Sequence, residues 1–227
     1  MQTTSITSED FGPAKQAMLV QRKQTFRKEK RRDDLTPIYQ HFFEYIESKS
    51  DCVLSKTEKE SIMNAFQVKK LRRRQYLLQE GDICTHFSYV VKGAVRMFSV
   101  NERGKEAIVD FGLEGDWVAD QESLELSRES FYNIEALEDT LLLVSCKSDF
   151  QGLLNQVPAV QVMINQCNRN QAIAIQRRIH TTISMSAEEK YLELLQKHPE
   201  YVQRFSLNMI ASYLGIKAET LSRVRSR

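Results

Sequence analysis

The residues best placed to do chemistry lie in the segment 206–225, which reads SLNMIASYLGIKAETLSRVR. Ser206 can cap a helix that runs through Tyr213. Gly215 follows at the point where a chain reversal needs a positive φ. A second helix is then expected from about Lys217 to Arg225, with apolar residues facing inward. This order of apolar, small, polar and glycine positions is typical of a helix-turn-helix.

The outward face of the second helix is expected to contact DNA, because a helix fits the major groove of B-form DNA. Arginine can pair bidentately with guanine, and glutamate can accept a hydrogen bond from cytosine. The two terminal arginines are better suited to phosphates. A plain helical hairpin packed on a core is the alternative. The predicted DNA-contacting residues are Lys217, Ala218, Glu219, Thr220, Ser222, Arg223, Arg225 and Arg227.

The sequence contains few motifs for catalysis, metal binding, disulfide formation or membrane insertion. The sequence has no glycine-rich phosphate loop, no H-E-x-x-H and no G-x-S-x-G, so an enzyme is not expected. The cysteines are far apart, at Cys52, Cys84, Cys146 and Cys167, which argues against a disulfide framework or a metal site and favours a reducing cytoplasm. No apolar run reaches the roughly 20 residues of a membrane helix.

Charge is unevenly distributed along the chain of 227 residues, although the formal net charge is only +2. Residues 22–32 and 69–74 are strongly basic, whereas residues 106–149 are mostly acidic. The basic segments could meet a polyanion or could be solvated surface. Residues 1–33 are interpreted as a mobile basic arm that either wraps DNA or is an inert extension.

The elements that position these residues follow from the hydrophobic pattern. Short β-rich runs separated by glycine turns predict an antiparallel sandwich or barrel, including a hairpin across Lys92-Gly93. The expected strands are 75–79, 87–91, 94–100, 105–111, 131–137 and 140–146. The expected helices are 35–48, 56–65, a short one capped by Asp149 and ending near Asn155, a long one over 158–184 that starts at Pro158, and 187–197.

This layout resembles the Crp/Fnr family of bacterial transcription regulators over about residues 38–227. The resemblance rests on E-G-D at 80–82, Y-V-V-K-G-A-V at 89–95, G-D-W at 115–117 and G-I-K-A-E-T-L-S-R-V-R at 215–225. It implies an α+β fold with an N-terminal antiparallel, jelly-roll-like β-roll, flanking helices and a C-terminal all-α helix-turn-helix domain without an evident wing. The domains implied are the arm 1–33, a sensor roll 34–157, a dimerisation helix 158–184 and a DNA-binding domain 185–227.

The resemblance also implies how such a protein would act. It would be a homodimer, joined through 158–184, that binds an inverted-repeat operator in double-stranded DNA, with RNA polymerase as a further candidate partner. Glu219 and Arg223 fall at the family's base-reading positions.

The effector site departs from the family pattern. Nucleotide-binding members hold the cyclic phosphate with an Arg-Ser or Arg-Thr pair, whereas this sequence has Ser130-Phe131, and Asp116 is taken to stand at the position of the ribose-binding Glu. Without a bidentate cation the phosphate is poorly held, and Phe131 would crowd it, so cyclic AMP binding is not expected and no cofactor is predicted. A different small molecule, a partner protein or no input at all stay open as the signal. The residues of a possible effector pocket are Gly115, Asp116, Trp117, Arg128, Ser130 and Phe131. A sensing module with weak or lost DNA binding is the alternative function.

Overall fold

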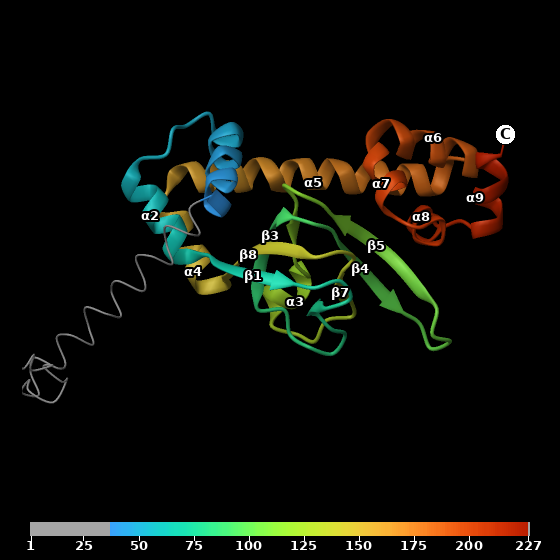
Figure 1. Ribbon diagram of the computed structural model, residues 1–227, viewed down its shortest axis with the longest axis horizontal. Helices are drawn as coiled ribbons and strands as arrows, with labels where there is room; N and C mark the ends of the chain where they lie inside the picture. Colours follow the sequence, from blue (N-terminus) through green and yellow to red (C-terminus); the bar gives the residue numbers. More distant parts are fainter. Residues whose placement is uncertain (1–36, 227) are drawn as a thin grey trace, which may run out of the picture. The chain divides into compact units, whose positions relative to one another are not determined.

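The computed structural model describes residues 37–226, and Figure 1 shows their arrangement into helices and strands. A helix covers residues 37–50, and residues 42–226 belong to one compact unit. The basic arm expected at 1–33 lies outside the described residues. Within 37–226, no helix is both long and apolar enough to cross a bilayer.

Two four-stranded antiparallel sheets form the β-roll (Figure 1). The first sheet has the order β1 (Gln67–Leu71), β8 (Thr140–Cys146), β3 (His86–Lys92) and β6 (Trp117–Val118). The second has the order β2 (Tyr76–Leu78), β7 (Asn133–Ala136), β4 (Val95–Val100) and β5 (Glu106–Gly112). The predicted antiparallel class is therefore confirmed.

A buried apolar cluster forms the core of the roll and draws on strands of both sheets. Four of its members have no exposed surface: Val90, Val95, Ala136 and Leu142. These residues are apolar and occupy inward positions of their strands, which is why the runs of short strands predicted a layered β structure.

The predicted hairpin across Lys92-Gly93 is wrong, because β3 and β4 belong to different sheets. The chain passes from one sheet to the other at Gly93, whose φ is 101°. A Cβ atom on Gly93 would lie 2.7 Å from the Cα of Thr140 and 2.9 Å from the carbonyl oxygen of Asp139. The glycine therefore serves a close backbone crossing, while the true hairpin joins β4 to β5.

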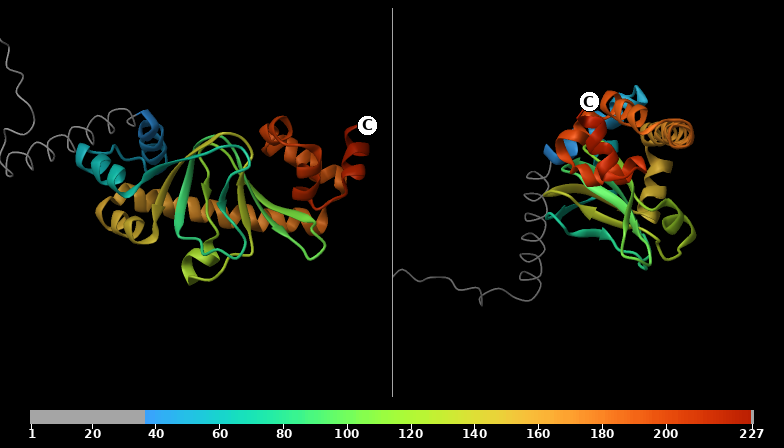
Figure 2. Two further views of the ribbon diagram at one scale, coloured as in Figure 1. Left: turned by 60° about the horizontal axis from the view of Figure 1, so that its bottom comes forward. Right: turned by 90° about the vertical axis from the view of Figure 1, so that its right-hand side faces the viewer.

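Helices flank the roll and make up the C-terminal part of the described chain (Figure 2). The reciprocal capping boxes Ser55/Glu58 and Ser186/Glu189 start two of them, as predicted. Pro158 opens the long helix at its predicted bounds. The helices are α2 (Lys56–Ala65), α3 (Gln121–Leu126), α4 (Lys147–Gln156), α5 (Pro158–Ser184), α6 (Ala187–Lys197), α7 (Pro199–Arg204), α8 (Leu207–Leu214) and α9 (Ala218–Arg225).

Five elements differ from the sequence-based expectation, and one of them is the two-residue strand β6, which the sequence did not predict. The short helix α4 begins at Lys147, so Asp149 lies in its first turn and does not cap it. Strand β1 has lysines at its centre instead of an apolar alternation, and it forms because it pairs with β8 over five residues. The helices α3 and α7 have six residues each, too few to show a periodic pattern.

A buried ion pair fixes the register between β4 and β7. Arg96 lies opposite Glu135, and its Nε donates to the Glu135 carboxylate over 2.7 Å, with both side chains about one-tenth exposed. Glu106 of β5 accepts from the same guanidinium. Removing one partner would leave a buried charge unpaired, so the three residues hold these strands together as a set.

We expect Gly93→Ala to destabilise the roll by about 1–3 kcal/mol more than Gly104→Ala does. Both glycines have a positive φ, so both variants carry the backbone strain of that conformation. Only Gly93 also meets backbone atoms of Asp139 and Thr140, whereas nothing lies within 4 Å of a Cβ on Gly104. Urea unfolding of the two variants measures the difference, and equal losses would show that the crossing at Gly93 can relax.

Candidate nucleic-acid interface

The helices α8 and α9 are joined by a tight turn with well-formed caps. The Ser206 hydroxyl accepts a hydrogen bond from the backbone N–H of Met209 over 3.4 Å. Gly215 ends α8 in the left-handed region, with φ 67°, and the N–H of Ile216 then donates to the carbonyl of Ala211. These are the local bonds by which a Schellman-type end turns the chain, so the predicted helix-turn-helix geometry is present.

A shared apolar core holds the two helices at a fixed angle. Ile210 and Ala211 on α8 are 2% exposed, and Leu221 on α9 is fully buried. Tyr191 and Leu194 of α6 complete the same cluster. Because the inner face of α9 is packed on two other helices, its outer face is presented as a rigid surface.

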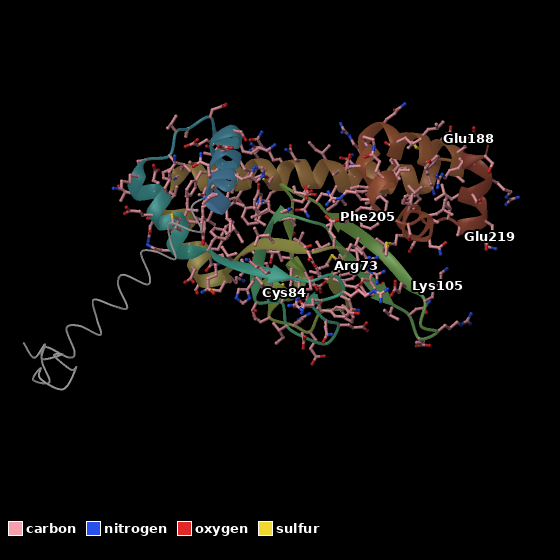
Figure 3. All side chains as sticks on the ribbon, in the orientation of Figure 1. Arg73, Cys84, Lys105, Glu188, Phe205 and Glu219 are labelled. Carbon is pink, nitrogen blue, oxygen red and sulfur yellow. The ribbon has the colours of Figure 1, made fainter. Side chains whose placement is uncertain are left out.

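The predicted DNA-contacting residues lie along the outer face of α9. Ala218 and Thr220 are half-buried, and the exposed residues are Lys217, Glu219, Ser222, Arg223 and Arg225. Arg227 lies outside the described residues. Figure 3 shows Glu219 at the end of the C-terminal helices, on the same side as Lys105 of the β4–β5 turn.

The cations of this face are available to an outside anion. Among the described residues, no carboxylate lies within 4 Å of Lys217, Arg223 or Arg225. Arg223 and Arg225 lie in the last turn of α9, where the helix dipole favours positive charge, and Glu219 lies in the first turn, where it favours negative charge. The charges therefore stabilise the helix and also give its surface cations that an anion can bind.

Side chains of α5 and α8 cover the free edge of β5. The Ser212 hydroxyl of α8 accepts from the N–H of Ile108 over 3.0 Å. The Arg178 guanidinium of α5 donates to the carbonyl of Val109. Arg178 also lies over the ring of Tyr213, 4.3 Å from its centroid. Backbone groups that an edge strand would expose to solvent are thus bonded by the helical part of the chain.

A ring stack and an ion pair also connect the roll to the C-terminal helices. The rings of Phe111 on β5 and Phe205 after α7 stack with centroids 4.1 Å apart (Figure 3 labels Phe205). Arg204 donates to Glu114 over 2.7 Å and also to Glu138. Burial opposes ionisation of Glu114, but hydrogen bonds from Arg204 outweigh it and hold the pKa of that carboxyl below its usual value.

A cavity of about 540 Å³ lies between the roll, α5, α6 and α8. Its polar lining includes Asp110, Asp120, Tyr132, Arg177, Lys190 and Tyr213. Burial raises the pKa of the Asp110 carboxyl. The cavity thus carries both acidic and basic groups, and Asp120 and Tyr132 are lining residues that the sequence did not reveal.

The residues expected to form an effector pocket do not gather around that cavity, and none of them is among its lining residues. Ser130 is buried, and its hydroxyl donates to Asp120 over 2.7 Å. The Asp116 carboxylate accepts from the N–H of Leu113, within the turn that contains Gly115. These contacts are local and structural.

The remaining three residues of the expected pocket also lie outside the lining of the cavity. The ring of Trp117 packs in an aromatic cluster with Phe42 and Phe150. Arg128 is exposed. Phe131 is 72% exposed. Asp120 is the N-cap of α3. The only sequence signal for Asp120 would have been this cap, and α3 is too short to be predicted.

Comparison with known proteins gives consistent matches. The family model described as cyclic nucleotide-binding domain matches residues 68–157. Regulatory protein HlyX of Actinobacillus pleuropneumoniae is 28% identical over 186 residues, which cover 77% of each protein. The fumarate and nitrate reduction regulatory protein of Yersinia pestis is 25% identical, covering 77% of this chain and 74% of the relative.

Solved structures share the fold. FixK2 from Bradyrhizobium japonicum superposes with a TM-score of 0.60 at 21% identity, over 71% of this chain and 83% of that one. The c-di-GMP-responsive regulator CLP from Xanthomonas campestris superposes with a TM-score of 0.61 at 17% identity, over 76% of this chain and 90% of that one.

Proposed function

Since the chain belongs to the Crp/Fnr family of transcription regulators and is a DNA-binding regulator, we propose that it acts as a homodimer on an inverted-repeat operator without cyclic AMP as its effector. The observation that carries this proposal is the outer face of α9. Its exposed arginines have no ion pair within the described part of the chain, and its inner face is locked in the core.

The side chains of α9 suit the groups found in a major groove. Arg223 can donate two parallel hydrogen bonds to a guanine, and Glu219, one turn earlier, can accept from a cytosine. Lys217 is the residue at the N-terminal cap of the helix, which is the end that enters the groove in this class of motif. Arg225 is suited to a phosphate, which positions the helix without reading sequence.

The exposed face of α5 supports a homodimer. Ile175, Ile179 and Ile183 are spaced four residues apart and are 54%, 55% and 79% exposed. An apolar stripe of this kind on a helix is costly in water and is stabilised when a second apolar surface covers it. A second copy of the same helix offers a matching stripe, and a two-fold pair would present two α9 helices to two half-sites about 34 Å apart.

The chemistry near the cavity supports the proposal that cyclic AMP is not the effector. Ser130, at the position where nucleotide-binding relatives carry arginine, is occupied by its bond to Asp120. The Arg178 guanidinium, which lines the cavity, already donates to two backbone carbonyls. Asp110 and Glu122 are also in the lining, and its other guanidinium, Arg177, comes from α5, so the singly charged phosphate of cyclic AMP would meet carboxylates without a bidentate partner from the roll.

Selection of bound fragments from a randomised pool of duplex DNA tests the proposed function. We expect enriched sequences with two inverted half-sites whose centres are about one helical turn apart, because a two-fold dimer imposes its symmetry on its site. Enrichment of no sequence, or of single half-sites only, would contradict the proposal.

We expect Arg223→Ala to weaken binding to the selected site by about 1–3 kcal/mol while leaving binding to unrelated duplexes nearly unchanged. The reason is that a base-reading arginine discriminates among sequences, whereas a phosphate contact strengthens all of them. Lys56→Ala, on the exposed start of α2, is the control with the same loss of charge. An equal loss for every sequence would assign Arg223 to a phosphate instead.

We expect isothermal titration of the purified chain with cyclic AMP to give no stoichiometric binding at micromolar ligand. The missing cationic partner for the phosphate is the physical reason. Stoichiometric binding in that range would overturn this part of the proposal and favour a nucleotide-sensing function.

A further inference from the structure

Five cations crowd the end of β1 and the turn that follows it. We call this group the basic turn; it consists of Lys69, Lys70, Arg72, Arg73 and Arg74. All five are exposed, and no carboxylate lies within 4 Å of their ammonium or guanidinium nitrogens among the described residues. By contrast, Arg96 and Arg204 elsewhere on the roll and on α7 each bind two carboxylates.

The backbone of the basic turn is tightly bonded. The N–H of Gln75 donates to the carbonyl of Arg72 over 3.0 Å, and the Gln75 side chain accepts from the N–H of Arg72 over 2.7 Å. The N–H of Arg74 donates to the carbonyl of Ala136 on β7 over 2.7 Å. The consecutive arginines therefore project from a turn whose backbone is fixed by hydrogen bonds.

Arg74 occupies a backbone conformation that its type rarely adopts. Its φ is 68°, in the left-handed region where glycine or asparagine is the usual residue. A glycine at position 74 would relieve the strain but would leave only two consecutive guanidinium groups, whereas arginine gives three. Strain of this kind is a reason to look for function at the residue.

Protection of a sheet edge explains only part of the basic turn. β1 pairs with β8 alone and is an edge strand, and lysines on an edge strand discourage pairing with other chains. That accounts for Lys69 and Lys70. It does not account for Arg72, Arg73 and Arg74, which follow the last residue of the strand.

The basic turn is connected through two neighbouring residues to α7, the helix that precedes the helix-turn-helix. The carboxylate of Asp139 accepts from the backbone N–H of Arg73 over 3.1 Å. The adjacent residue, Glu138, accepts from Arg204 of α7. Two consecutive acidic residues thus connect the basic turn on one side with the C-terminal helices on the other (Figure 3 labels Arg73 and Phe205).

We propose that the basic turn binds phosphates of the DNA that flanks the operator, a second DNA-binding surface in addition to α9. The inference rests on the proposed function. Guanidinium groups donate bidentate hydrogen bonds to phosphate oxygens, and each neutralised phosphate releases counterions. Duplex DNA is the favoured polyanion because Asp139 and Glu138 connect the turn to α7, which precedes the helix-turn-helix; an acidic protein surface is the competing partner.

The test compares two variants that each lose two charges. Arg72→Gln/Arg73→Gln removes guanidinium groups but keeps the backbone bond from Arg73 to Asp139, and Lys49→Gln/Lys56→Gln removes two lysines on helix 37–50 and α2. Fluorescence anisotropy measures binding to a short duplex that ends at the selected inverted repeat and to a longer duplex with flanks, over a range of salt concentrations. Urea unfolding verifies that both variants are folded.

The arginine variant is expected to bind the short duplex like the parent and to lose the extra affinity that the flanks provide. On the longer duplex its salt slope should fall by about 0.9 for each phosphate that the variant no longer neutralises, while the lysine variant keeps the parental slope. Arg74→Asn, which tolerates the left-handed φ, should weaken flank binding without a loss of stability. This second variant separates a role in binding from a role in folding.

An unchanged salt slope of the arginine variant on the longer duplex would overturn the inference while leaving the proposed function intact, since short-duplex binding is measured alongside. Unchanged DNA binding together with lost binding to purified RNA polymerase would overturn it in favour of an acidic protein. A parent that prefers no DNA sequence would refute the proposed function itself and the inference with it.

Discussion

The contact between β5 and the C-terminal helices is the interaction on which the rest of the structure depends. Phe111 stacks on Phe205, and Ser212 and Arg178 bond to backbone groups along the free edge of β5. One hydrophobic cluster includes residues of β4, β5, α6, α8 and α9, so the core that holds α9 in place continues into the roll. A displacement of β5 would be transmitted to α9 because close-packed interiors transmit strain.

Cations are divided between two tasks according to whether they have a partner. Arg96, Arg178 and Arg204 are bonded to carboxylates or carbonyls and connect strands to strands or helices to strands. The arginines of α9 and of the basic turn have no such partner among the described residues and face outward. The net charge of +2 does not reveal this division, because it sums all charges whether or not they are paired.

Sequence reasoning succeeded where structure is encoded locally. The capping boxes at Ser55 and Ser186 and the proline at 158 indicated helix starts, and Gly215 indicated the turn between α8 and α9. These features depend on residues within one or two turns of each other, so no knowledge of the fold is needed to see them.

It failed where distant parts of the chain decide the outcome. β1 is a strand because β8 pairs with it, although its own residues are mostly charged or polar. Gly93 looks like a hairpin turn, and only the closeness of Thr140 shows that it is a crossing between sheets. The cavity joins residues of the roll with residues of α5, α6 and α8, so alignment of a short segment around Ser130 could not identify its lining.

The covered edge of β5 has a consequence for the independence of the two halves of the molecule. A roll severed from its C-terminal helices would present the bare N–H of Ile108 and the bare carbonyl of Val109 to whatever extended peptide came near. Such an edge invites strand addition and aggregation. The helices α5 and α8 therefore also protect this edge of the sheet from other chains.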